Sequence, residues 1–345
     1  DFEEKLVVRS ALLLLVFFSA TIQVESKPSL KANHLLVFGD SYVDTGNTPK
    51  SSSSSWKLPY GFTFPGHPSG RYSNGRVWSD FIAMNLGFRS IISYELIPGR
   101  ENHRRYGINF AFSGTGVFDT LAPYPNMTAQ IDILQQLVRD HHLNSDDLGS
   151  SVALVAVSGN DHYMFLLEHG LNATIREWED FLQKVVNQTL YDVRRINSLG
   201  IKRIAVDALA PLGCLPAVAA VNGNAECDDR SNQLSQLHNQ LLNAGIAKLS
   251  ADMPDASFVY VDLYAAFTTA IKEHEKTYGG NQLEPCCAGK NASFVCGSVD
   301  DDGVKQYTVC DRPDSKFFWD GVHPTQQGWK SVYLTLRSTL RRLSI

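Results

Sequence analysis

The sequence predicts an α/β protein of three layers, in which helices cover both faces of a five-stranded parallel sheet. Two features lead to this prediction. Short apolar runs, bounded by glycine, aspartate or asparagine, alternate along the chain with longer segments of helical periodicity. These runs are apolar at consecutive positions, which is typical of strands whose sheet is covered on both faces.

Five segments are expected to form the strands. The first, Leu35–Phe38, is a run of four apolar residues that stops at Gly39-Asp40. A valine-rich run further along the chain is strongly β-prone and leads to Asn160. The full set comprises 35–38, a run within 107–116, a run within 152–161, 203–206 and 258–261.

Six segments repeat apolar residues at helical spacing and are expected to form the covering helices. The longest of them carries an apolar stripe, and Asn187 falls on the side opposite to it. The stripe consists of Ile175, Trp178, Leu182, Val185, Val186, Val193 and Ile196. The six segments are 77–86, 129–142, 174–197, 231–250, 265–278 and 326–343. Their alternation with the strands predicts a flavodoxin-like layout.

Ser41 directly follows the first predicted strand, within HLLVFGDSYVDTGN (34–47). In open α/β sheets, ligands bind at the carboxyl ends of the strands. A serine at this edge is a candidate nucleophile, although a Gly-Asp-Ser tripeptide by itself is more often an ordinary polar turn.

The segment FFWDGVHPT (317–325), near the other end of the chain, places Asp320 three residues before His323. A serine nucleophile needs a base, and a neutral imidazole needs a partner on its second ring nitrogen to hold the useful tautomer. This pair can fill both roles. The alternative is an Asp-Gly turn before a helix that starts at Pro324. Because the base would act in its neutral form, kcat/KM is expected to rise with pH.

Two further strand ends could stabilise the oxyanion of a tetrahedral ester intermediate. Gly114, in GINFAFSGTG (107–116), lacks a Cβ and can bring its N–H close to a ligand. Asn160, in VALVAVSGND (152–161), offers a side-chain amide. With the N–H of Ser41, they could form an oxyanion hole. Each is also compatible with an ordinary loop residue, but four such segments in one chain favour the catalytic interpretation.

These four segments resemble the four sequence blocks of the SGNH hydrolases, and in particular the plant GDSL esterase/lipase family. The resemblance covers nearly everything after the first 33 residues. Two further strings, KLPYGFTFPGHPSGRYSNGR (57–76) and PLGCLP (211–216), match the plant family. The resemblance implies the SGNH hydrolase fold.

The same resemblance implies a division of roles in the site. Ser41 is the nucleophile, His323 the general base and then acid, Asp320 its orienter, and Gly114 and Asn160 the oxyanion donors. Two positions depart from the family pattern: Tyr42 stands where leucine is usual, and His162 stands where an aromatic residue is usual. Both are candidates for the wall of the substrate pocket, although a packed or exposed histidine is the commoner case.

Composition excludes several functions. The net charge of −5 comes from 31 basic and 36 acidic residues without a basic block, so neither nucleic acid nor an anionic membrane surface is expected as a partner. No metal or organic cofactor is expected. The adjacent Cys286 and Cys287 suit no familiar zinc site, and the acidic run Asp300–Asp302 lacks a glutamate at EF-hand spacing.

The first 26 residues are predicted to be a signal peptide, followed by a single domain over 27–345. Ser10–Ala20 is an apolar segment with Lys5 and Arg9 before it, and it is too short to span a bilayer. The alternative is a buried strand or helix. A secreted protein without a stable membrane span is expected.

All six cysteines lie in the second half of the chain, and an even number in a secreted protein indicates disulfides. A turn could join the first two, whereas each of the adjacent third and fourth could reach the fifth or the sixth. In order they are Cys214, Cys227, Cys286, Cys287, Cys296 and Cys310. Four sequons are compatible with glycosylation: Asn126, Asn172, Asn187 and Asn291.

An aromatic cluster follows the nucleophile, and it could line an acyl or aryl pocket or form a packed satellite of the core. Its members are Trp56, Tyr60, Phe62, Phe64 and Tyr72.

The leading hypothesis is a secreted serine esterase or lipase that acts on a small-molecule or lipid ester. An acyltransferase would use the same acyl-enzyme and differ only in the acceptor. A non-enzymatic carbohydrate- or lipid-binding relative is disfavoured, because it would have no use for Asp320, His323 and Asn160 together.

Overall fold

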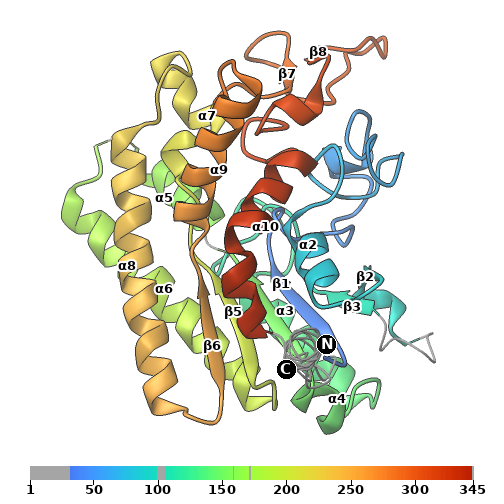
Figure 1. The fold of residues 1–345 in the computed structure, drawn as a ribbon, viewed down its shortest axis with the longest axis vertical. Helices are drawn as coiled ribbons and strands as arrows, with labels where there is room; N and C mark the ends of the chain where they lie inside the picture. Colours follow the sequence, from blue (N-terminus) through green and yellow to red (C-terminus); the bar gives the residue numbers. More distant parts are fainter. Residues whose placement is uncertain (1–31, 99–105, 158, 171, 344–345) are drawn as a thin grey trace, which may run out of the picture. The chain divides into compact units, whose positions relative to one another are not determined.

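The computed structural model describes residues 32–98, 106–157, 159–170 and 172–343, and the predicted signal peptide within 1–26 lies outside them. The described helices and strands form three layers, with a parallel sheet between two groups of helices (Figure 1). The prediction of a three-layer α/β/α fold is therefore confirmed.

The sheet has six strands in the order β2-β3-β1-β4-β5-β6, all parallel. The prediction of five strands is wrong because it lacks the edge strand β2. Its sequence, SIIS, has only two apolar residues, and it pairs with β3 alone, so it buries too little surface to give a strong pattern. The strands are β1 Leu35–Gly39, β2 Ser90–Ser93, β3 Tyr106–Asn109, β4 Val152–Ala156, β5 Arg203–Asp207 and β6 Ser257–Val261.

Successive side chains of β1 enter different cores, because neighbouring residues of a strand point to opposite faces of the sheet. Leu35 and Val37 pack in one core, and Leu36 and Phe38 pack in the other. All four side chains are fully buried. Since burying each contributes about 1.5–3 kcal/mol, both cores anchor the strand that leads to Ser41.

Six longer helices supply these cores and agree with the six predicted segments. Helices α2, α9 and α10 pack with the core of Leu35, and α3, α6 and α8 pack with the core of Leu36. Their bounds are α2 Trp78–Asn85, α3 Met127–Arg139, α6 Ile175–Ser198, α8 Asp229–Asp252, α9 Leu263–Tyr278 and α10 Gln326–Leu340.

Three shorter helices have no counterpart in the sequence analysis: α4 Ser145–Gly149, α5 Gly159–His169 and α7 Pro216–Ala219. Helix α5 matters most, because it begins at the end of β4 and carries Asn160 in its first turn. One member of the predicted apolar stripe is wrongly placed: Ile175 is 76% exposed, since it is the first residue of α6.

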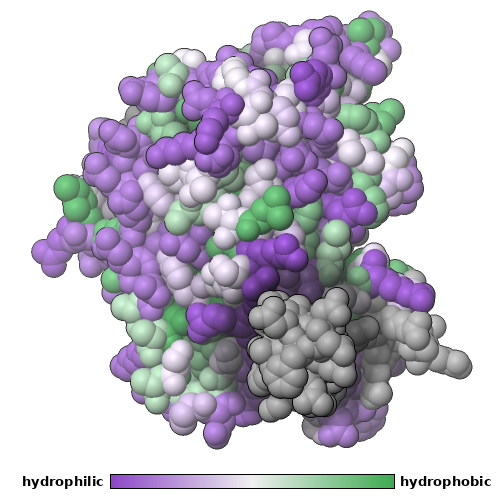
Figure 2. All heavy atoms as spheres, in the orientation of Figure 1, coloured by the Kyte–Doolittle hydropathy of each residue, from purple (hydrophilic) through white to green (hydrophobic). Residues whose placement is uncertain are grey.

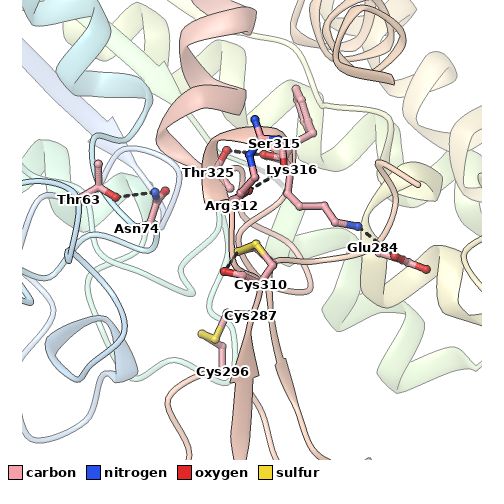
Figure 3. Close-up of a disulfide and its surroundings, with 12 residues drawn as sticks. Thr63, Asn74, Glu284, Cys287, Cys296, Cys310, Arg312, Ser315, Lys316 and Thr325 are labelled. Carbon is pink, nitrogen blue, oxygen red and sulfur yellow. Dashed lines mark hydrogen bonds and ion pairs between the residues drawn. A yellow bond between two sulfur atoms is a disulfide. The ribbon is translucent and has the colours of Figure 1, made fainter. Parts of the chain in front are cut away.

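Three disulfides join all six cysteines, and Figure 3 shows Cys287, Cys296 and Cys310 among them. The bonds are Cys214–Cys227, Cys286–Cys310 and Cys287–Cys296. The first is the pairing that the turn indicates, and the other two settle the alternatives that the sequence leaves open. A small antiparallel hairpin, β7 Cys287–Gly289 and β8 Tyr307–Val309, carries part of this disulfide-bonded segment.

On the face shown in Figure 2, hydrophilic residues predominate and apolar residues are scattered among them. This pattern is usual where the large apolar side chains lie mainly in the cores. Across the described residues, no helix combines the length and the apolar content needed to cross a membrane.

Candidate active site

Ser41 follows β1 directly, in a turn that depends on glycine. Gly39 has a φ of +149°, and a Cβ there would lie 2.0 Å from the carbonyl oxygen of Ala156 in β4. The N–H of Asp40 donates to that same oxygen at 3.2 Å. Gly39 therefore lets β1 lie against β4 up to its last residue and present Ser41 at the carboxyl edge of the sheet.

A chain of hydrogen bonds links Ser41 to Asp320 through His323. Ser41 Oγ lies 2.8 Å from His323 Nε2, and His323 Nδ1 lies 2.8 and 2.9 Å from the two carboxylate oxygens of Asp320. An ionised Asp320 accepts the Nδ1–H, so Nε2 is left to accept the proton of the Ser41 hydroxyl. A nucleophilic serine requires this arrangement.

Asp320 is only 7% exposed, yet its surroundings favour the ionised form. Burial by itself would raise the pKa of Asp320. The charge and hydrogen bond of His323, together with the backbone N–H groups of Val322 and His323, outweigh burial and hold that pKa below its ordinary value. Both N–H groups donate to Oδ1 at 2.9 Å. His323 therefore has an anionic partner throughout the neutral pH range.

The turn that carries His323 is joined to the disulfide-bonded segment by backbone hydrogen bonds. The N–H of Trp319 donates to the carbonyl of His323 at 2.7 Å and closes the turn. The N–H groups of Cys286 and Cys287 donate to the carbonyls of Phe318 and Trp319 at 3.0 and 2.6 Å. Two of the three disulfides thus start from residues whose backbone is bonded to the segment directly before the His323 turn.

Asn160 and Gly114 follow the strands on either side of β1, since the sheet runs β3-β1-β4 at this point. The Nδ2 of Asn160 donates to the carbonyl of Thr115 at 2.9 Å, in the loop after β3. An amide nitrogen carries two hydrogens, so a second one can serve another acceptor. Gly114 has a φ of +83°, a conformation that favours glycine. Their oxyanion roles stay predictions.

Polar residues that fix the loops around the nucleophile are missed by the sequence analysis. Asp44 accepts hydrogen bonds from the N–H and the hydroxyl of Ser113, at 3.1 and 2.8 Å. Asn47 donates to the carbonyl of Asn109 at 2.9 Å, at the end of β3. The available signal is the string DTGN after Gly-Asp-Ser-Tyr-Val: short polar residues beside a buried strand must find partners, and here they do.

A cavity of about 780 Å³ opens beside the nucleophile. Ser41, Asn160 and His323 line it, whereas Gly114 is not among its described lining residues. The wall continues past the ends of β4 and β5 to α5, α6 and α8. It is mainly apolar there, with Leu166, Trp178, Leu209, Leu215, Leu234 and Leu263 among its residues. Such a cavity suits the apolar part of a small molecule.

Tyr42 and His162 both line this cavity. The Tyr42 hydroxyl donates to the carbonyl of Val322 at 2.9 Å, and its ring lies edge-on to His323 with centroids 5.9 Å apart. His162 is buried beside Trp178, and burial lowers the pKa of His162 to about 3, which keeps it neutral. Contact of either residue with substrate stays a prediction.

The aromatic cluster after the nucleophile does not line the described cavity. Tyr60 packs against Trp319 in a small buried cluster, and Tyr72 stacks on His323 with ring centroids 4.7 Å apart. Of the two interpretations that the sequence allows, a packed satellite describes Tyr60 and Tyr72, whereas Phe62 is 43% exposed. The other residues of the predicted aromatic cluster are Trp56, Phe62 and Phe64.

Three carboxyl groups near the carboxyl edge of the sheet are buried and have raised pKa values. Burial raises the pKa of Asp40 to about 7 and that of Asp161 to about 6, and it raises the pKa of Asp207 well above its ordinary value. Asp207 Oδ2 accepts the indole N–H of Trp78 at 2.8 Å, and its Oδ1 finds no partner among the described residues. Burial with a single donor therefore favours the protonated, neutral form of Asp207.

The four sequon asparagines differ in exposure. Asn172, Asn187 and Asn291 are exposed, and Asn126 is half-buried because its side chain caps α3. Glycosylation of these residues stays a prediction.

The acidic run at 300–302 forms a loop in which Asp300 accepts the backbone N–H groups of Asp302 and Val304, at 3.2 and 2.8 Å. Within the described ranges, no group of three or more histidine, cysteine or acidic side chains is arranged to hold a metal ion.

Comparison with known families supports the interpretation of the site. The family model for GDSL-like lipases and acylhydrolases matches residues 35–334, from the first residue of β1 into α10. The chain belongs to this family. The resemblance noted in the sequence is thereby confirmed, and with it, at the level of the family, the prediction of an ester hydrolase.

Plant members of the GDSL family are similar over most of their length. GDSL esterase/lipase At5g03610 of Arabidopsis thaliana is 48% identical over 312 residues, which cover 89% of this chain and 86% of that protein. GDSL esterase/lipase At3g09930, from the same plant, is 44% identical over 324 residues, covering 92% and 90%.

A solved extracellular lipase from Streptomyces rimosus aligns over 90% of this chain and 100% of its own, with 14% identity and a TM-score of 0.39. Because that score is below 0.5, the family assignment rests on the sequence matches.

Proposed function

We propose that this GDSL protein is a secreted serine esterase that hydrolyses carboxylic esters through an acyl-enzyme on Ser41. The observation that carries the proposal is the unbroken hydrogen-bond chain from Ser41 through His323 to Asp320. A hydroxyl is a weak nucleophile by itself, and an acceptor at 2.8 Å that can take its proton makes attack feasible.

In the first half of the reaction, Ser41 Oγ bonds to the acyl carbon while its proton moves to His323 Nε2. The bond to the alcohol oxygen then breaks, and His323 returns the proton to that oxygen as the alcohol leaves. In the second half, water attacks the acyl carbon, His323 takes its proton, and the same proton restores the Ser41 hydroxyl as the acid departs.

Negative charge builds on the carbonyl oxygen in both halves, and fixed donors stabilise it. The Asn160 side chain shares the cavity with Ser41, and its anchorage to Thr115 restricts where Nδ2 can lie. The backbone N–H groups of Ser41 and Gly114 are the other proposed donors.

The substrate class follows from the cavity. Its lining is mainly apolar beyond the three reacting residues, which favours an ester with an apolar acyl or alcohol part. Within this wall, burial raises the pKa of Asp207 well above its ordinary value and lowers the pKa of His162 to about 3, so burial favours the neutral form of both, while Asp228 and Arg230 add polar groups to the lining.

The decisive experiment compares the wild type with Ser41→Ala on p-nitrophenyl esters from acetate to palmitate. The chain from about Lys27 onward is produced through an oxidising secretory pathway. Hydrolysis should fall by at least ~10³ in the variant, because no other group would accept the acyl chain. Equal rates in two proteins with matching thermal unfolding would contradict the proposal. Product analysis with an added alcohol separates hydrolysis from acyl transfer.

Secretion is supported by the use of all six cysteines in disulfides, which persist in oxidising compartments. Expression of the full chain in plant cells tests it. The protein should be found in the medium, and enzymatic removal of N-glycans should lower its apparent mass if the sequons are used. Retention of an intact 345-residue chain inside the cell would contradict secretion.

A further inference from the structure

The Asp320 carboxylate accepts a hydrogen bond from a fourth donor, which has no role in the proposed esterase mechanism. Besides the backbone N–H groups and the imidazole, the Tyr60 hydroxyl donates to Oδ2 at 2.8 Å. Tyr60 lies 260 positions away in the sequence and is only 3% exposed. The oxygen that Tyr60 contacts also lies 2.9 Å from His323 Nδ1.

Tyr60 is held by its neighbours on two sides. Its ring contacts Tyr72 and Trp319 edge-on, with centroids 5.4 and 6.3 Å apart. The loop that carries it is joined to the residue after His323 by Ser73, whose hydroxyl donates to the carbonyl of Pro324 at 3.0 Å. The loop is also closed on itself, since the N–H of Gly61 donates to the carbonyl of Ser73 at 2.9 Å.

The Tyr60 loop has further cross-links. The Asn74 side chain donates to the Thr63 hydroxyl at 2.9 Å and accepts the N–H of Gln326 at 2.8 Å (Figure 3 shows the first of these bonds). The phenol is therefore presented to Asp320 by a loop that is joined by hydrogen bonds to the segment directly after His323.

We propose that Tyr60 is a positioning residue for the catalytic pair, which rests on the proposed esterase function. Its hydroxyl keeps Asp320 turned toward His323 and takes up part of the carboxylate charge. Less of that charge then remains to stabilise the imidazolium, so His323 gives up its proton at a lower pH than it would beside Asp320 alone. The consequence is a neutral, active base over a wider acidic range.

Among the residues that the structure describes, four titratable side chains face the pair of Asp320 and His323. Tyr60 and Tyr72 approach it from the loop at 57–76, and Asp40 and Tyr42 approach it from the end of β1. Burial and the neighbouring Asp320 raise the pKa of Tyr60 well above its ordinary value, so it stays a donor at every working pH. Burial raises the pKa of Asp40 to about 7, so Asp40 must be left unaltered in every variant compared.

The test is Tyr60→Phe, which removes one oxygen and keeps the ring. Tyr307→Phe is the matched control, because Tyr307 belongs to the same buried cluster but donates to the carbonyl of Leu58 at 3.3 Å. The titration midpoint of His323, followed by NMR and assigned with His323→Gln, should rise by roughly 0.5 to 1 pH unit in Tyr60→Phe. The acid limb of kcat/KM should move by the same amount, and neither should move in Tyr307→Phe.

An unchanged midpoint in a folded Tyr60→Phe variant would overturn the proposal, and so would an equal shift in the control. The NMR measurement needs no substrate, so it decides the role of Tyr60 even if Ser41→Ala shows that the protein is not an esterase. If Tyr60→Phe does not fold, the NMR spectrum of the wild type tests the proposal instead. The Tyr60 hydroxyl proton should give a downfield resonance that is lost in Asp320→Ala, and its absence from the wild type would overturn the proposal.

Discussion

The candidate site consists of two halves that bury carboxyl groups to a similar depth but treat them differently. In the sheet-edge half, which follows β1, β4 and β5, Asp40 and Asp207 are 7% and 5% exposed, and burial raises both pKa values. In the turn half, residues 317–325, Asp320 is 7% exposed and has a lowered pKa. Depth of burial therefore does not decide which acid is ionised.

The difference lies in the neighbouring groups, above all the charge of His323 beside Asp320. Asp207 accepts one indole N–H, whereas Asp320 accepts two backbone N–H groups, an imidazole N–H and the phenol of Tyr60. At Asp320 the charge and hydrogen bond of His323, with two backbone N–H groups, outweigh desolvation, whereas the two backbone N–H groups that donate to the side chain of Asp161 do not outweigh it there. The two halves are also built differently, since strand pairing forms the first, while loops, aromatic packing and disulfides hold the second.

The largest loss of kcat is expected from replacing Asp320, the acid of the turn half. Asp320→Asn should lower kcat by about 10⁴, because an amide does not hold the Nδ1–H tautomer of His323. Steady-state kinetics on a chromogenic ester would measure it, with the exposed Asp302→Asn as the matched control. A loss of less than tenfold would mean that the donors around Asp320 serve only the fold.

Replacing Asn160, in the sheet-edge half, should lower kcat by a smaller factor. Asn160→Ala should lower kcat by about 10² to 10³ with little change in KM, because the donor acts mainly on charge in the transition state. Asn187→Ala, an exposed asparagine on α6, is the control. Should kcat fall by under tenfold, Asn160 would be removed from the oxyanion hole.

The Cys286–Cys310 disulfide could contribute both to the stability of the fold and to the geometry of the turn half. Replacing Cys286 and Cys310 together by serine should destabilise the fold by about 3 kcal/mol, from the 24 residues that the bond spans. The kcat of the folded fraction should also fall, because Cys286 pairs through its backbone with Phe318. Thermal unfolding and kcat, measured on the same sample, check both. A lower Tm with an unchanged kcat would show that the turn holds its geometry without this disulfide.

The smallest effect concerns the pH dependence of stability in the sheet-edge half. Because burial raises the pKa of Asp207 in the folded protein, while the unfolded chain releases this proton above about pH 4, the residue should lower stability progressively as pH rises above about 4. The Tm of Asp207→Asn relative to wild type should therefore increase between pH 4 and pH 8. A difference that is constant with pH would show that Asp207 is ionised in the folded protein.

How much of the site can be predicted from the sequence depends on how local each signal is. Ser41 and the Asp320–His323 pair stand out because each lies in a short string at the end of a predicted element. The role of Tyr60 is not predictable in this way, since it depends on a contact between residues 260 positions apart.

The limits of the fold prediction have similar causes. The edge strand β2 is too short and too little buried to give a pattern, and the pairing of Cys286 and Cys287 depends on how two loops cross. The six long helices are predictable because each has an apolar stripe that repeats within the segment itself.

The separation of the nucleophile and its base along the chain also has a consequence for biosynthesis. Ser41 and His323 are 282 positions apart, and β1 is completed long before α10. At roughly 5–20 residues per second, between about a quarter of a minute and one minute passes between the synthesis of the two. On the proposed mechanism, a growing chain therefore carries Ser41 without its base until the segment with His323 has been made.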